Sequence, residues 1–200
     1  MNDTLSRSLI AAIEHGKLDT VREILDRAPV CAHVVLSPTG HHALGIAAWQ
    51  DQVQILQYLV ETGVPVDTRD AVGRTALHVA CNEGSLSSTE FLLQRGADPN
   101  AKSGSESYTP LYLACLHVSD DQRSIIQILR SHGAEVDLHS AVILGDLEKV
   151  RQILEAEPNA TSKAIDCAAL VQSAVGLVLG HHLEKAIPIL TVLLEHGAII

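Results

Sequence analysis

The strongest constraint on this chain is an internal repeat with a period of about 33 residues. Three copies begin with similar eight-residue blocks: GHHALGIA from residue 40, GRTALHVA from residue 73 and SYTPLYLA from residue 107. Within these blocks Leu44, Leu77 and Leu111 are separated by 33 and 34 residues. One such unit cannot bury its own apolar face, so the copies must stack side by side.

Each block is followed by a second segment with helical apolar periodicity that ends at a glycine, namely Gly63, Gly96 or Gly133. Glycine suits a helix C-terminus because it adopts the left-handed conformation without a steric penalty. A short segment with Asp67, Asp98 or Asp137 then leads to the next copy. The sequence therefore predicts a unit of helix, helix and hairpin-like loop.

The T-P-L-H-x-A pattern of these blocks and the Gly-Ala-Asp-x-Asn ending at residues 96–100 resemble the ankyrin repeat. The resemblance implies an all-α ankyrin-repeat solenoid of about six helix-turn-helix repeats with short hairpin-like loops, forming a single domain over residues 1–200. The expected repeats span residues 6–36, 37–69, 70–102, 103–137, 138–160 and 161–200. The first and fifth are degenerate, because they resemble each other and end at Pro29 and Pro158.

The composition agrees with this fold and limits the classes of partner that the chain is expected to bind. Aromatic residues make up only 2% of the chain, so the core must be aliphatic, as in closely packed helices. The net charge is −10 and no stretch gathers basic residues, which argues against nucleic acid and anionic membrane as partners. No run of eighteen apolar residues and no secretory signal occurs, so we expect a cytoplasmic protein.

Four cysteines are predicted to be free thiols: Cys31, Cys81, Cys115 and Cys167. Their spacing forms no C-x-x-C pair. Cys81 and Cys115 share one position in successive repeats, and stacked helices lie about 10 Å apart, beyond the reach of about 7 Å for a disulfide.

Several residues of the blocks have predicted structural roles. Thr75 and Thr109 should act as helix N-caps, with Pro110 in the first helical turn. The resemblance implies that His78 forms hydrogen bonds between neighbouring loops. Because Gly45 and Tyr112 occupy its place in the flanking repeats, we expect this histidine network to be interrupted there.

No catalytic motif, cofactor fingerprint or convincing metal site is present, so we expect neither an enzyme nor a bound cofactor or metal. The best metal candidates are the pairs His41-His42 and His181-His182, the latter with Glu184. Adjacent residues point in different directions on a helix, and no third ligand is evident. We interpret these histidines as solvated residues.

The resemblance also implies where a partner binds, because positions that do not build the stack line its concave face. The predicted partner-binding residues are His41, Trp49, Gln50, Arg69, Arg74, Asn82, Glu83, Tyr108, Leu116 and His117. Trp49 is the leading candidate, since aromatic side chains dominate interface energetics. In the alternative interpretation Trp49 is a core residue.

Two local departures leave alternatives open. Three extra residues fall within 116–122, where they form either a specificity-determining insertion or a longer turn. Leu92, Asp98 and Asn100 have the spacing recognised by asparaginyl hydroxylases, but Asp and Asn are also ordinary turn residues, which is the favoured interpretation.

The sequence therefore predicts a module that binds an unidentified protein or peptide on its concave face. The alternative is a structural or regulatory ankyrin domain within a larger polypeptide or oligomer. The C-terminal residues Gly197-Ala198-Ile199-Ile200 bear on this choice, because a solenoid needs a polar cap and two isoleucines end the chain. We expect a monomer, with this apolar end as an alternative surface for association.

Overall fold

The structure is a computed structural model that describes residues 2–32, 40, 42–104, 107–117, 119–157 and 183–196. Within these ranges the regular secondary structure is helical, which confirms the predicted all-α fold class. The chain divides into two compact units, residues 1–134 and 135–200, which are described separately below.

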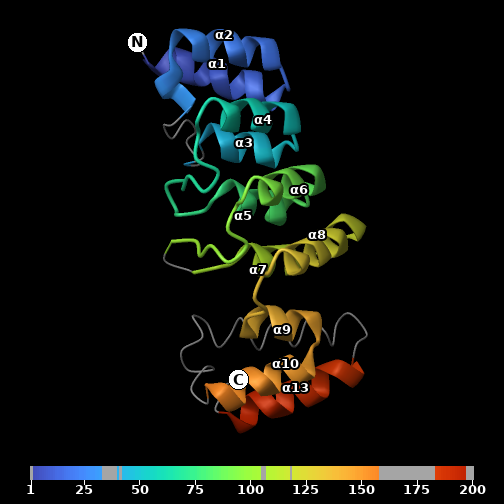
Figure 1. The fold of residues 1–200 in the computed structure, drawn as a ribbon. Helices are drawn as coiled ribbons and strands as arrows, with labels where there is room; N and C mark the ends of the chain where they lie inside the picture. The colour runs from blue at the N-terminus through green and yellow to red at the C-terminus, as the bar shows by residue number, and fades with distance from the viewer. Residues whose placement is uncertain are drawn as a thin grey trace. The chain divides into compact units, whose positions relative to one another are not determined.

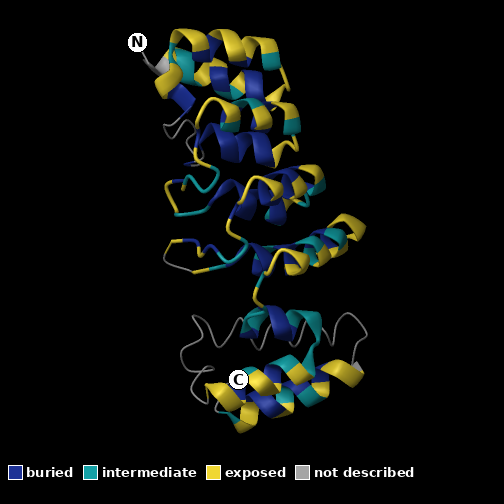
Figure 2. Ribbon diagram, viewed as in Figure 1, coloured by how far each residue is buried: buried dark blue, intermediate teal, exposed yellow. Residues whose placement is uncertain are grey.

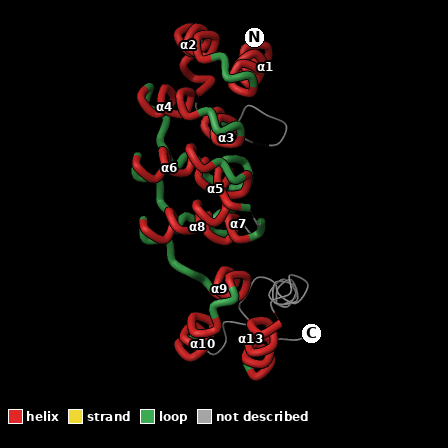
Figure 3. Tube along the Cα trace, turned by 90° about the vertical axis from the view of Figure 1, so that its right-hand side faces the viewer, coloured by secondary structure: helices red, strands yellow, loops and turns green. Residues whose placement is uncertain are grey.

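The described residues of the first unit form four helix pairs, and hairpin-like loops follow the second and third pairs (Figure 1). The pairs are α1 (Asn2–Glu14) and α2 (Leu18–Arg27), α3 (Ala43–Trp49) and α4 (Val53–Glu61), α5 (Ala76–Glu83) and α6 (Leu86–Gln94), and α7 (Pro110–Cys115) and α8 (Asp120–Ser131). A short 3-10 helix, η1 (Pro29–Ala32), follows the first pair. Figure 3 shows that α1, α3, α5 and α7 form one layer of this unit and α2, α4, α6 and α8 the other.

The first helix of each pair, here called the inner helix, carries the core. Leu44, Leu77 and Leu111 are all fully buried, as the period predicts. Alanines at a second shared position, Ala47, Ala80 and Ala114, are also fully buried. Because alanine leaves little bulk between helices, successive inner helices pack closely. The outer helices α4, α6 and α8 bury one side and expose the other (Figure 2).

The glycines that end the outer helices have the predicted left-handed backbone. Their φ angles are +96° at Gly63, +83° at Gly96 and +86° at Gly133. The loops that follow are hydrogen-bonded to one another: the Ala71 N–H donates to the Gly40 carbonyl at 3.1 Å, and the Gly104 N–H donates to the Val72 carbonyl at 3.0 Å. The hairpin loops are therefore stacked like the helices.

The N-caps of α5 and α7 are confirmed. The Thr109 hydroxyl accepts a hydrogen bond from the Tyr112 N–H at 3.1 Å, and Pro110 occupies the first turn of α7. At α5, Thr75 and His78 form a capping box in which the Thr75 N–H donates to His78 Nδ1 at 3.1 Å.

The prediction that the histidine network is interrupted at α3 is wrong. His42, three residues before the expected position, is the N-cap of α3 and accepts a hydrogen bond from the Gly45 N–H at Nδ1. Its Nε2 lies 2.8 Å from the Thr68 carbonyl oxygen in the next hairpin loop. The imidazole of His42 therefore joins the start of α3 to the hairpin loop that follows α4.

The three extra residues near 116–122 lengthen an outer helix. Helix α8 has 12 residues, whereas α4 and α6 have nine each. Ser119 caps this added turn by accepting the Gln122 N–H at 3.1 Å. The connection is also longer, with four residues (116–119) between α7 and α8 against two between α5 and α6, so the interpretation as a longer turn is partly correct and a role in specificity stays a prediction. The added helical turn carries the exposed Asp120 and Asp121.

The second unit contains α9 (Leu138–Leu144), α10 (Leu147–Ala156) and α13 (Leu183–Glu195) among its described residues. Their apolar sides share one core, which comprises Leu138, Ala141, Val142, Val150, Leu154, Ile189, Val192 and Leu193. Gly145 ends α9 with φ +68°, and Gly16 follows α1 with φ +64°, in agreement with the similarity of the two degenerate repeats. The first helix predicted for the sixth repeat lies outside the described residues.

Two glycines with nearly equal φ angles allow the energetic cost of backbone strain to be distinguished from the cost of disturbing the stacked loops. Gly73 (φ +82°) and Gly96 (φ +83°) both disfavour a side chain, but a Cβ at Gly73 would lie 2.5 Å from the Gly104 nitrogen, whereas none of the described atoms lies within 4 Å of one at Gly96. We expect Gly96→Ala to lower the free energy of unfolding by about 1–2 kcal/mol. Gly73→Ala should lower it by a further 1–3 kcal/mol or so, because the stacked loops must separate. Equal losses in urea unfolding would contradict this assignment.

Candidate protein-binding surface

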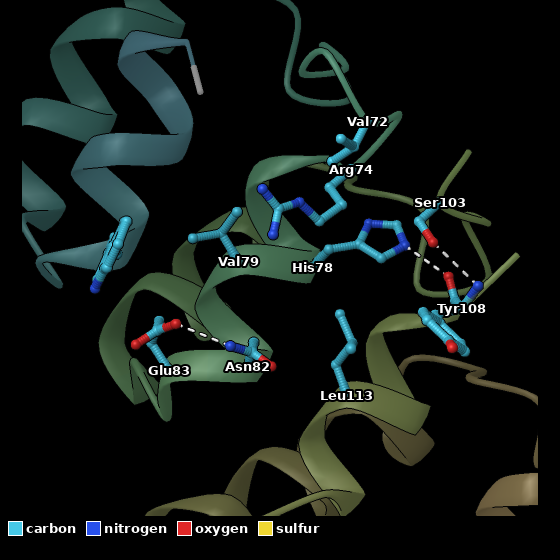
Figure 4. Close-up of a pocket in the computed structure, with 10 residues that line it drawn as sticks. Val72, Arg74, His78, Val79, Asn82, Glu83, Ser103, Tyr108 and Leu113 are labelled. Carbon is cyan, nitrogen blue, oxygen red and sulfur yellow. Dashed lines mark hydrogen bonds between the residues drawn. The ribbon is translucent and has the colours of Figure 1, made fainter. Parts of the chain in front are cut away.

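A hollow of about 410 Å³ lies in the first unit, where the inner helices meet the hairpin loops. Figure 4 shows nine of its ten lining side chains with labels. The lining residues are Trp49, Val72, Arg74, His78, Val79, Asn82, Glu83, Ser103, Tyr108 and Leu113. This volume falls within the range of about 300–1,000 Å³ that is common for ligand-binding clefts.

The stacking of the repeats brings these residues together from three inner helices and two hairpin loops. Trp49 ends α3, while Val79, Asn82 and Glu83 lie on α5 at positions i, i+3 and i+4, which face the same side of a helix. Leu113 lies on α7, and the loops before α5 and α7 supply the remaining walls. The surface exists only because three successive inner helices are packed in register.

Five of the ten predicted partner-binding residues line the hollow: Trp49, Arg74, Asn82, Glu83 and Tyr108. Trp49 is 43% exposed, so the alternative that it is a core residue is wrong. Its carbonyl accepts a hydrogen bond from the Ser85 hydroxyl at 3.3 Å, which joins the end of α3 to the turn between α5 and α6. The assignment of these residues to partner binding remains a prediction.

The other predicted residues lie outside the hollow. Gln50, Leu116 and His117 are exposed at the ends of inner helices, and Arg69 is exposed in a hairpin loop. His41 lies outside the described residues. Arg69 has a structural role, because its Nη1 donates to the Gly73 carbonyl at 2.7 Å and to the Lys102 carbonyl at 2.5 Å.

Sequence reasoning missed the apolar floor of the hollow. Val79 and Leu113 occupy one shared repeat position, two residues after Leu77 and Leu111. Helical spacing offered a signal, since Val79 precedes Asn82 by three residues and Glu83 by four, and all three therefore share a face. An apolar residue inside a helix is more often core, and Val79 is indeed largely buried.

Arg74 enters the hollow as one half of an ion pair. Its Nη2 lies 3.0 Å from Oδ2 of Asp70, whose side chain is only 2% exposed. The other carboxylate oxygen of Asp70 accepts the Val72 N–H at 3.0 Å and the Arg74 N–H at 2.8 Å. These bonds fix the loop that carries both Val72 and Arg74, and they balance the charge of the guanidinium.

His78 forms both part of the stack and part of the hollow's wall. Its Nδ1 accepts from the Thr75 N–H and its Nε2 lies 3.0 Å from the Tyr108 carbonyl, so the predicted bond between neighbouring loops is present (Figure 4). Burial lowers the pKa of His78 below its ordinary value of 6.5, against the opposing effect of the Tyr108 carbonyl. The neutral imidazole, with an acceptor at Nδ1 and a donor at Nε2, satisfies both contacts.

Asn100 has a structural role in the hairpin loop. Its N–H donates to Asp98 Oδ1 at 2.9 Å, which forms an Asx-type turn, and its Nδ2 donates to the Gly133 carbonyl of the next repeat at 3.0 Å. The side chain thus links two loops. These contacts support the favoured interpretation as a turn residue.

The described residues contain no cluster of three or more His, Cys, Asp or Glu side chains that could hold a metal ion. His42 is only 1% exposed, so its interpretation as a solvated residue is wrong. His41, His181, His182 and Cys167 lie outside the described residues. Cys31, Cys81 and Cys115 are free and buried, as predicted, and burial raises the pKa of the Cys81 thiol far above its ordinary value. No helix in the described ranges is long and apolar enough to cross a membrane.

Stacked helix pairs, hairpin loops bonded to each other and a hollow on the inner helices define a helical repeat protein. The chain belongs to the ankyrin repeat family: the family described as "Ankyrin repeats (3 copies)" matches residues 9–103 and 64–139. Proteins of this family are generally protein–protein interaction modules and generally not enzymes.

Several known proteins are similar to this chain. It is 35% identical over 101 residues to "Ankyrin repeat and KH domain-containing protein mask-1" of Caenorhabditis elegans, covering 50% of this chain and 4% of that protein. It is 32% identical over 134 residues to the B-cell lymphoma 3 protein homolog of Mus musculus, covering 60% and 29%. The probable 26S proteasome regulatory subunit p28 of Saccharomyces cerevisiae is 27% identical over 123 residues, covering 62% and 53%. The chain thus spans less than two thirds of each relative's length.

The stability of the first unit should depend on pH through His78. Because its folded pKa lies below 6.5, the unfolded chain binds more protons in the window between that pKa and 6.5. The free energy of unfolding is therefore greatest, with respect to this group, above pH 6.5 and decreases as the pH falls through the window. We expect His78→Gln, which can keep the capping box but cannot titrate, to show a weaker decrease in denaturant unfolding between pH 7.5 and 5.5. Identical slopes for the two proteins would contradict this explanation.

Proposed function

We propose that this chain binds a segment of a partner protein on the face formed by its inner helices and hairpin loops. The family assignment supports a protein partner, and the hollow offers a place for it. The cysteines among the described residues, Cys31, Cys81 and Cys115, are free and buried, which suits a reducing compartment, and we therefore place the interaction in the cytoplasm.

The observation that carries this proposal is the exposure of two large apolar side chains at one hollow. Trp49 is 43% exposed and Val72 is 55% exposed, and both line it. Burying the exposed part of such side chains is worth about 25 cal/mol per Å², so a partner that covers them gains affinity. A tryptophan at the wall of a preformed concave site is the type of residue that acts as an interface hot spot.

A second candidate function is a structural or regulatory role within a larger polypeptide or oligomer. One observation favours it: Ile187 and Leu194 on α13 are 60% and 45% exposed. They are seven residues apart and therefore lie on one face of the helix. An apolar face of this kind in the second unit offers a contact surface that is separate from the hollow.

Replacing Trp49 by alanine should weaken partner binding much more than it lowers the stability of the fold. We expect Trp49→Ala to weaken partner binding by about tenfold or more, the usual effect of losing an aromatic hot spot. The melting temperature should decrease by only a few degrees, because the side chain is 43% exposed.

The measurement is affinity capture with the intact protein, followed by a dissociation constant for each captured partner. Gln94→Ala, at an exposed position on the outer helix α6, provides a matched control that should bind like the unchanged protein. Tyr108→Ala tests the opposite wall of the hollow. Capture of the same proteins with the same affinity by all four proteins would exclude the inner face as the binding surface.

A further inference from the structure

One end of the hollow combines an exposed indole with a carboxylate. Trp49 and Glu83 end the neighbouring inner helices α3 and α5, and both line the hollow. The hydrogen bond from the Ser85 hydroxyl to the Trp49 carbonyl holds these two helix ends together. Figure 4 shows the Glu83 carboxylate at the edge of the hollow beside Asn82.

Within the described residues, the Glu83 carboxylate has a hydrogen-bond donor but no basic side chain in ion-pair contact. The donor is Asn82 Nδ2, which lies 2.8 Å from Glu83 Oε1. The cation nearest in the lining, Arg74, is already paired with Asp70. The negative charge of Glu83 is therefore available to a partner.

Further carboxylates lie at the same ends of the helices. Asp51, two residues after Trp49, accepts the Ser88 N–H at 2.7 Å. Gln122 Nε2 donates to the Asn82 carbonyl at 3.4 Å, which brings the added turn of α8, with its exposed Asp121, to this side of the repeat. The one described cation on that turn, Arg123, is paired with Asp120 at 2.6 Å. The helix ends around the hollow are therefore acidic, and helix C-termini add partial negative charge.

We propose that this end of the hollow binds an arginine side chain of an extended segment of the partner protein. This inference rests on the proposed function and specifies its partner. A guanidinium can stack on the indole of Trp49 and form two parallel hydrogen bonds to the carboxylate of Glu83. Val79 and Leu113, on the floor of the hollow, contact the methylene part of the same side chain or an apolar neighbour.

The geometry of the stack also sets the length of the segment. Trp49, Asn82 and Leu116 occupy the same position in three successive repeats. Helices pack about 10 Å apart, so about 20 Å separates the first and third positions. An extended chain covers about 3.3 Å per residue, and a segment of six to eight residues or so spans this distance.

The test selects a displayed library of random eight-residue peptides on the intact protein, with Trp49→Ala as the counter-selection. Trp49 is the only tryptophan in the chain, so its fluorescence reports directly on peptides bound at this site. Each selected sequence is then synthesised twice, with arginine and with citrulline, a neutral side chain of nearly the same shape. Fluorescence titration gives both dissociation constants.

We expect arginine to be enriched in the selected peptides and to bind about five- to twentyfold more tightly than citrulline, as the sum of a cation–π contact and a partly exposed ion pair. Glu83→Gln, which removes the charge but keeps an acceptor for Asn82, should abolish this preference. Glu90→Gln is the matched control, because Glu90 is exposed on the outer helix α6 of the same repeat. It should retain the full preference.

The outcomes separate this inference from the proposed function. Peptides that need Trp49 but bind equally well with arginine and citrulline would overturn the arginine site and leave binding on the inner face intact. A preference for arginine that survives Glu83→Gln would overturn the assignment of Glu83. If no peptide is enriched over the Trp49→Ala counter-selection, and captured partners also bind Trp49→Ala with unchanged affinity, both proposals fail.

Discussion

The packing of successive inner helices is the interaction on which the rest of the first unit depends. Leu44, Leu77 and Leu111 are fully buried at one shared position, with alanines three residues later. Truncating a fully buried leucine typically costs about 2–5 kcal/mol, a large fraction of the stability of a small domain. The contacts that shape the hollow cross from repeat to repeat, and they form only when these helices are in register.

Polar contacts then determine the positions of the hairpin loops, which the apolar core of the helices does not fix. His42 and His78 each use one ring nitrogen within their own repeat and direct the other to a carbonyl of the next loop. A buried hydrogen bond contributes about 1 kcal/mol net, so such bonds mainly determine geometry. Since the Tyr108 carbonyl accepts from His78 while the Tyr108 side chain lines the hollow, the same bond that joins two repeats also positions a wall of the binding surface.

The sequence predicted features that recur with the period and missed those that arise between repeats. The leucine spacing predicted the inner helices, because it reflects a requirement for burial. The glycines predicted where the outer helices end, because those positions require a positive φ. The role of His42 was missed, since it depends on where the Thr68 carbonyl lies after folding. Asp51, with φ +51°, was missed for the same reason: its carboxylate accepts an N–H from α6, 37 residues away.

The candidate binding surface could be predicted only in part for a related physical reason. Positions that do not build the stack can be identified from the repeat, and this is how Trp49 and Glu83 were found. The hollow itself depends on side-chain sizes across three repeats, including Val79, which belongs both to the core of its own repeat and to the floor of the surface.

The column formed by Trp49, Asn82 and Leu116 alternates between apolar and polar residues, while the buried leucines beneath it do not vary. The stack thus tolerates changes in the column without losing register, and recognition can differ between members of such a family while the fold is kept.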